Sequence, residues 1–91
     1  MRPQNLAQFK KWLAEAKENG STLRSEVLAP TGEVARQQPH APVSVVQANM
    51  FALKRNEQDS YTEFGKASQW KFTDNDATKQ MVGGSLKFSY L

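Results

Sequence analysis

The chain has 91 residues, and twelve lysine and arginine residues against nine aspartate and glutamate residues give it a net charge of +3. It contains no cysteine, which excludes disulfide bonds and thiolate metal sites, so packing must supply its stability. The charge excess is small and neither half of the chain is a basic tail, so only folding could concentrate it into a surface for nucleic acid.

The length predicts one domain, residues 1–91, with an economical core, since a domain this short buries only about 60 to 65% of the surface that its unfolded chain exposes. No apolar run approaches the roughly 18 residues that a membrane span needs. The first residues reach charges and glutamines too soon for a signal peptide. We therefore expect a soluble protein of the cytoplasm, with no contact to a membrane.

The first predicted element is an amphipathic helix over residues 5–19. Its apolar positions recur at spacings of three and four residues and are Leu6, Phe9, Leu13 and Ala16. Asn5 can act as the N-cap with Gln8 as its reciprocal partner, and Asn19-Gly20 supplies a left-handed end. Trp12 lies beside the apolar stripe, and we interpret it as a core anchor rather than a binding residue.

Strands are predicted after the helix. Residues 22–29 have a strand-like pattern and are followed by a turn at 30–32, while the proline- and glutamine-rich stretch 35–42 fits neither period and is predicted to be a surface loop. His40 in this loop has no second histidine and no cysteine to join it in a metal site, so we expect it to be solvated.

Residues 43–54 are apolar on both alternating faces, which favours one central strand. A helix is the competing interpretation, because this stretch also contains good helix formers. If it is a strand, the polar side chains of Gln47 and Asn49 share a face with Phe51 and need hydrogen-bond partners where they are buried. A charged turn is predicted at 55–60.

The last third alternates between strands and turns. Strands are predicted at 61–64 and 69–72, a turn or short helix at 74–84, and a final strand at 85–91 that places Leu86, Phe88 and Tyr90 on one face. The predicted fold class is α+β, with the N-terminal helix packed on a four- to five-stranded antiparallel sheet that is either curled or a partly open barrel.

Many aromatic rings fall within a short part of the chain: Phe51, Tyr61, Phe64, Trp70 and Phe72. Large rings are an efficient way to build a small core, since each buries about 150 to 250 Å². They are also interleaved with Lys54, Arg55, Lys66, Lys71 and Lys87, which is the composition of a base-stacking platform. A ring cannot both fill the core and stack on a base, and we predict that the rings face inward.

No catalytic constellation stands out. No serine has the glycines of a nucleophile elbow, and Gly83-Gly84 is not followed by the lysine of a phosphate-binding loop. The stretch 74–76 resembles the start of a calcium loop, but Lys79 and Ser85 stand where that loop needs glycine and glutamate. We predict a protein that is not an enzyme and uses no cofactor or metal.

Residues 43–72 and the end of the chain carry a pattern with a family resemblance. The residues are Val46, Gln47, Asn49, Phe51, Ser60, Tyr61, Lys66, Ala67, Trp70, Phe72 and Tyr90. The pattern resembles small uncharacterised proteins encoded by bacteriophages and prophages, which place an amphipathic helix before a short sheet. This chain departs from it in the longer loop at 35–42 and in Gly65, where the pattern has proline. The resemblance implies a phage origin.

Phage origin implies a function in which a short protein binds and blocks a host protein, with anti-CRISPR or other anti-defence inhibition as its most specific form. Such inhibition needs a rigid surface with aromatic or arginine anchors. Arg55, Tyr61 and Lys66 lie at or beside predicted turns, and we expect them to contact a host protein or nucleoprotein complex in the bacterial cytoplasm. Basic anchors favour occlusion of a protein surface over mimicry of DNA.

The alternative function is a small nucleic-acid-binding module that uses the basic and aromatic residues of the sheet. The oligomeric state is open between a monomer and a homodimer, because an edge strand at 85–91 could pair with a second copy.

Overall fold

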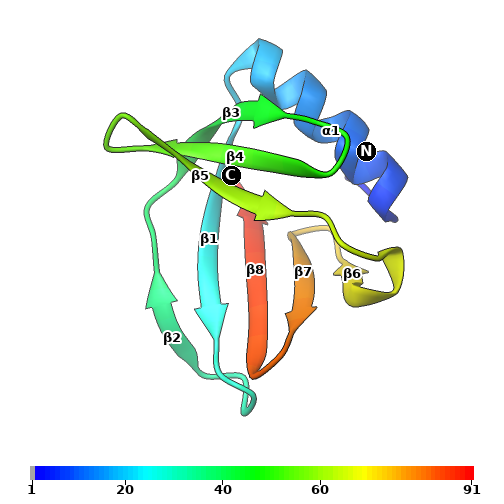
Figure 1. Ribbon diagram of the computed structural model, residues 1–91, viewed down its shortest axis with the longest axis vertical. Helices are drawn as coiled ribbons and strands as arrows, with labels where there is room; N and C mark the ends of the chain where they lie inside the picture. The colour runs from blue at the N-terminus through cyan, green and yellow to red at the C-terminus, as the bar shows by residue number, and fades with distance from the viewer. Residues whose placement is uncertain (1) are drawn as a thin grey trace.

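The computed structural model describes residues 2–91 and confirms the predicted α+β fold class (Figure 1). One helix packs on an antiparallel sheet of eight strands rather than four or five. The elements are α1 (Leu6–Asn19), β1 (Thr22–Leu28), β2 (Val34–Gln37), β3 (Ala41–Val46), β4 (Met50–Arg55), β5 (Gln58–Glu63), the 3-10 helix η1 (Ala67–Gln69), β6 (Trp70–Phe72), β7 (Asp76–Met81) and β8 (Gly84–Tyr90). No helix within residues 2–91 is long and apolar enough to cross a membrane.

Helix α1 begins and ends as predicted. The side chain of Asn5 accepts a hydrogen bond from the backbone N–H of Gln8 at 2.9 Å, and Gly20 ends the helix in the left-handed conformation with φ of 80°. The reciprocal contact is displaced by one residue, because the Gln8 side chain accepts from the N–H of Gln4, at 2.8 Å, instead of that of Asn5.

The Asn5 cap leads to a first prediction. Replacing Asn5 with alanine leaves a first-turn N–H without its partner and should lower the free energy of unfolding by about 1 kcal/mol. Serine at the same position can still accept this hydrogen bond, so Asn5→Ser should stay close to the unchanged protein. Urea unfolding followed by circular dichroism measures both variants. Equal loss in both would mean that the side-chain oxygen is not what stabilises the helix start.

The sheet folds into two layers. Its strand order is β5-β4-β3-β1-β8-β7-β6, and β2 pairs with β1 outside this path. The start of β1 pairs with β3 and its end pairs with β2. Figure 1 shows β3, β4 and β5, here called the hairpin layer, running across the main layer formed by β2, β1, β8, β7 and β6. The two layers meet through β1 and β3, and the sheet is not closed into a barrel.

The segment predicted as one central strand over 43–54 is two strands. Most of β3 and most of β4 lie in it, and the exposed residues 47–49 form the turn between them, closed by the N–H of Gln47 donating to the carbonyl of Met50 at 2.8 Å. The prediction was wrong because polar Gln47 and Asn49 mark a reversal of the chain. They need no buried partners, since both are exposed.

Two further segments predicted as irregular contain strands. The stretch 35–42 holds most of β2 and the start of β3, and the stretch 74–84 holds β7. All four residues of β2 are exposed, so neither face needed the apolar pattern that identifies a strand. The predicted edge strand at 85–91 was also placed wrongly, because β8 lies between β1 and β7. Its edges are therefore not free to pair with a second copy.

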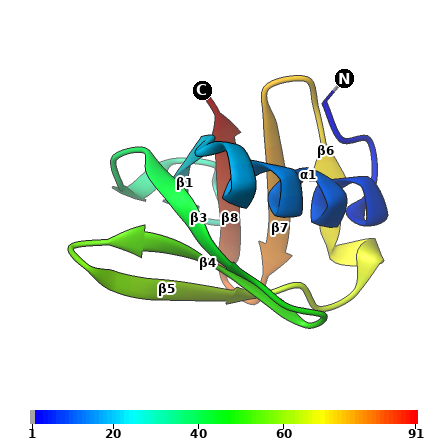
Figure 2. The same ribbon diagram turned by 90° about the horizontal axis from the view of Figure 1, so that it is seen from above.

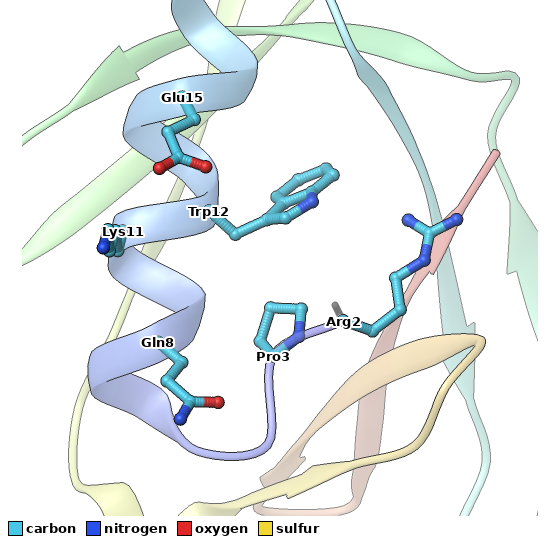
Figure 3. Close-up of a pocket in the computed structure, with 6 residues that line it drawn as sticks. All are labelled: Arg2, Pro3, Gln8, Lys11, Trp12 and Glu15. Carbon is cyan, nitrogen blue, oxygen red and sulfur yellow. The ribbon is translucent and has the colours of Figure 1, made fainter.

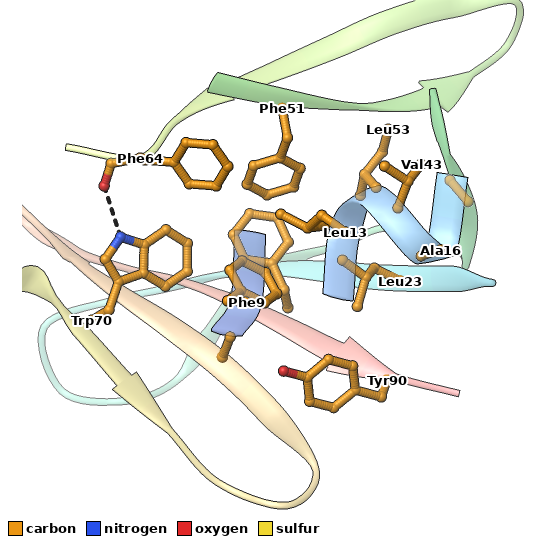
Figure 4. Close-up of a cluster of buried hydrophobic side chains, with 13 residues drawn as sticks. Phe9, Leu13, Ala16, Leu23, Val43, Phe51, Leu53, Phe64, Trp70 and Tyr90 are labelled. Atoms are coloured by element: carbon orange, nitrogen blue, oxygen red, sulfur yellow. Dashed lines mark hydrogen bonds between the residues drawn. The ribbon is translucent and has the colours of Figure 1, made fainter. Parts of the chain in front are cut away.

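Four of the five rings predicted to face inward pack in or against the core, whereas Tyr61 is exposed and the prediction was wrong for it. Phe51, Phe64, Trp70 and Phe88 are buried, and the Trp70 ring N–H donates to the carbonyl of Phe64 at 2.7 Å (Figure 4). Phe9 from α1 stands among them, with ring centroids 5.8 Å from Phe51 and 5.3 Å from Trp70. Helix α1 thus fills one end of the space between the two layers. Trp12 is partly buried and stacks on Phe9 at the edge of this core, at 6.4 Å.

Candidate binding surface

The end of the interlayer space that lies away from Phe9 is an open cleft of about 210 Å³, here called the arginine cleft. On β4, residues Phe51, Leu53 and Arg55 alternate onto the inward face and lead from the core to this opening. On the main layer, β1 contributes Ser25 and Val27, and the neighbouring strands contribute Arg36 and Leu86. The side chains between the two layers therefore change from apolar in the core to positively charged at the opening of the cleft.

Arg55 links the two layers at the mouth. Its guanidinium donates to the hydroxyl of Ser25 on β1 and to that of Ser60 on β5, the latter at 3.3 Å. Its Nε is buried without a hydrogen-bond partner. Burial lowers the pKa of Arg55 from its usual value, and the positive charge of Arg36 lowers it further. The protein thus holds a partly desolvated cation beside a second cation, an arrangement that an anion would relieve.

No acidic residue lines this cleft among the described residues. Glu26 follows Ser25 on β1 and so points to the opposite face, where it is 3.9 Å from Arg24 and accepts from Gln37 at 3.2 Å. Asp59 pairs with Lys54 at 3.7 Å on the outward face of the hairpin layer. Both of these acids are engaged on other faces, and the positive charge of the cleft has no carboxylate partner within its lining.

The structure brings together two of the three residues predicted to bind a partner. Arg55 lies in the cleft and Tyr61 borders it. Tyr61 is opposite Ala52 in the β4–β5 register, which places its ring on the outward face, 54% exposed. Lys66 is exposed and immediately precedes η1, which leads into β6. Figure 1 shows β6 on the other side of the molecule from the β4–β5 turn. It therefore does not share a site with Arg55.

Sequence reasoning missed Ser25 and Arg36. Arg36 lies on the strand that was predicted as a loop, and it comes next to Val27 through the β1–β2 register. Ser25 is an ordinary polar residue until the fold places it under Arg55. The residues next to Ser25 and Arg36 in the sequence do not indicate a binding site, because the cleft forms only when distant segments of the chain pair.

A second hollow, of about 290 Å³, lies between α1 and the N-terminal segment. Figure 3 shows Trp12 and Pro3 facing this space. Arg2 and Lys11 both line it, and Arg2 is already engaged, since its guanidinium is 4.5 Å from the centroid of the Tyr90 ring and donates to the Leu91 carbonyl at 3.1 Å. Burial raises the pKa of Tyr90 to about 12, so the phenol stays neutral. Unlike the arginine cleft, this hollow also contains a carboxylate, that of Glu15.

The chemistry available at the arginine cleft is recognition of an anion. Three or more histidine, aspartate or glutamate side chains do not gather into a metal site anywhere in residues 2–91. The cleft holds two guanidinium groups and hydroxyls of Ser25 and Ser60, all of which donate hydrogen bonds. Comparison with models of protein families, with curated proteins and with solved structures finds no match for this chain.

Proposed function

We propose that this chain is a small non-enzymatic binding protein that attaches to a macromolecular partner through the arginine cleft and acts by covering part of the partner's surface. The observation that carries the proposal is Arg55, which is partly desolvated at an open mouth beside Arg36 and has no carboxylate among the residues around it. Arginine and tyrosine are the residue types that most often anchor protein interfaces. Tyr61, exposed on the outward face of the hairpin layer next to the cleft, is a second residue of this kind.

The more specific form of the proposal is inhibition of a bacterial host protein, such as a CRISPR effector complex, by steric occlusion. Its support is the resemblance of residues 43–72 to small phage and prophage proteins. The site would then cover a host surface that binds nucleic acid or changes shape, and it would need no catalytic group.

A nucleic-acid-binding function has less support from the rings. Phe51 and Trp70 are 0% and 6% exposed, so they offer no face for base stacking. Such a function would rest on phosphate contacts, and its affinity would fall steeply between low and physiological salt. Association with a protein through a buried arginine contact would be much less sensitive to salt.

Capture from bacterial lysate tests the proposal. The immobilised protein should retain one host protein after nuclease treatment and at physiological salt. Arg55→Gln should reduce that capture about 30-fold or more, because loss of an interface anchor costs about 2 kcal/mol or more. Lys66→Gln, a cation changed in the same way across the molecule, should retain it.

Circular dichroism must show that both variants are folded. Recovery of nucleic acid alone, with every protein lost after nuclease treatment, would contradict the proposed function. Equal capture by the Arg55→Gln and Lys66→Gln variants would contradict the assignment of the cleft.

A further inference from the structure

The arginine cleft has free donors that point to a particular ligand chemistry. An arginine guanidinium carries five N–H groups. The bonds to Ser25 and Ser60 use one on each terminal nitrogen of Arg55, which leaves a second N–H on each. Arg36 forms no ion pair within residues 2–91 and its side chain is exposed at the same cleft. Paired N–H groups of this kind match the two oxygens of a carboxylate.

The volume of the cleft limits what can enter. Pockets for drug-sized ligands usually have about 300 to 1,000 Å³, whereas the arginine cleft has about 210 Å³. A single acidic side chain fits this space better than a whole cofactor or nucleotide.

An apolar surface continues from the cleft. A neighbouring hollow of about 230 Å³, here called the tip hollow, shares Val27 and Leu86 with the arginine cleft and also contains Met81 and Val82. Val27, Met81 and Val82 are exposed, so this end of the main layer leaves large apolar side chains in solvent. A ligand that reaches both hollows must carry an anion and an apolar group side by side.

We propose that the arginine cleft binds a glutamate or aspartate side chain of a partner protein, and that an apolar side chain next to this acid rests on Val27 and Leu86 in the tip hollow. The inference rests on the proposed function and specifies its partner, namely a polypeptide segment in which an acidic residue is flanked by apolar ones. Charge complementarity selects this occupant, because the cleft holds two cations and no acid among its lining residues. The apolar floor shared by the two hollows favours a polypeptide over a free ion.

Blocked peptides test this chemistry without the native partner. The probes are acetylated and amidated Leu-Glu-Leu, its matched control Leu-Gln-Leu, and Ser-Glu-Ser, which keeps the acid and lacks the apolar groups. Two-dimensional NMR follows the Arg55 Nε–H signal and the backbone amides of residues 25–28 and 84–88. We expect Leu-Glu-Leu to shift these signals saturably and to bind at least about tenfold more tightly than Leu-Gln-Leu, since a charge-assisted bond contributes about 1.5 to 3 kcal/mol. Ser-Glu-Ser should also bind less tightly than Leu-Glu-Leu, because it buries no apolar side chain in the tip hollow.

Variants locate the site. Arg36→Gln removes an exposed side chain, so the fold should persist, and it should weaken Leu-Glu-Leu binding about tenfold or more. Arg24→Gln is the matched control, because Arg24 sits beside Glu26 on the opposite face of β1, and it should leave binding unchanged. Equal binding of the glutamate and glutamine peptides, or equal effects of the two arginine variants, would overturn the inference.

Inorganic phosphate is the competing ligand. Phosphate that binds as tightly as Leu-Glu-Leu, and that displaces it from the same signals, would overturn the assignment to an acidic polypeptide and identify a phosphate site instead. Different results would contradict the inference and the proposed function.

A partner captured through Arg55, together with peptides that do not distinguish glutamate from glutamine, contradicts only the inference. Selective peptide binding without any captured protein contradicts only the proposed function.

Discussion

Phe9→Ala should lower the free energy of unfolding by about 3 to 5 kcal/mol, as expected when a fully buried aromatic ring is truncated. Phe9 is 0% exposed, and its ring lies within 6 Å of the ring centroids of Phe51, Trp70 and Phe72. These three rings come from both layers of the sheet, so the truncation opens a cavity where α1 holds the layers together. A domain of this size is stable by roughly 5 to 15 kcal/mol, and the variant should therefore be close to unfolding.

Urea denaturation followed by tryptophan fluorescence measures this loss. The control is Tyr61→Ala, which removes a ring of similar size from an exposed position and should change stability by about 0.5 kcal/mol or less. A loss below about 1 kcal/mol in Phe9→Ala would mean that α1 is not required for the core.

Gly84→Ala should be the second severe substitution. Gly84 begins β8 with φ of 152°, and a Cβ atom there would overlap the backbone carbonyl oxygen of Leu28 on β1. Overpacking costs about 1 to 3 kcal/mol and a strained backbone costs a similar amount. Because the obstacle is main chain and not a flexible side chain, we expect a loss of about 2 to 6 kcal/mol.

Gly83 provides the matched comparison for this prediction. It also has a positive φ, of 81°, but nothing lies within 4 Å of where its Cβ would be. Gly83→Ala should therefore cost only the conformational strain, about 1 to 2 kcal/mol. Thermal unfolding of the two single variants separates close approach from strain. Equal losses would show that the contact with Leu28 does not limit the residue at position 84.

Local signals allowed the helix and several strands to be predicted. Asn5 and Gly20 mark the ends of α1 through contacts within a few residues. The charged turn after β4 was recognised but drawn too long, since the reversal needs only Asn56 and Glu57, both with positive φ. Asparagine is common at such positions and glutamate is not, so the sequence did not show how tight this turn is.

Strands were missed where a buried position carries a charged side chain, or where every residue of the strand is exposed. Strand β7 was misread because Lys79 occupies a buried position, where its ammonium group donates to the Glu63 carbonyl at 2.7 Å. Ala77 and Lys79 are the buried positions of this strand. Because lysine is charged, the sequence does not show the alternation of apolar and polar residues that indicates a strand. The binding surface shows the same limit, since Arg55 and Tyr61 could be proposed from their place near a turn. Arg36 depended on a strand without any apolar pattern.

The pairing of β1 with β8 joins nearly opposite ends of the sequence, with Leu23 beside Tyr90 and Val27 beside Leu86. Contacts so distant along the chain slow folding, and domains dominated by them fold in milliseconds to seconds rather than microseconds. Arg55 and Arg36 each belong to a hairpin of neighbouring strands, β4–β5 and β1–β2, which can pair early. The apolar surface of Val27 and Leu86 is complete only when β1 pairs with β8. We therefore expect chains in which β1 and β8 have not yet paired to lack the complete arginine cleft and tip hollow. A partner that binds there would select chains that have finished folding.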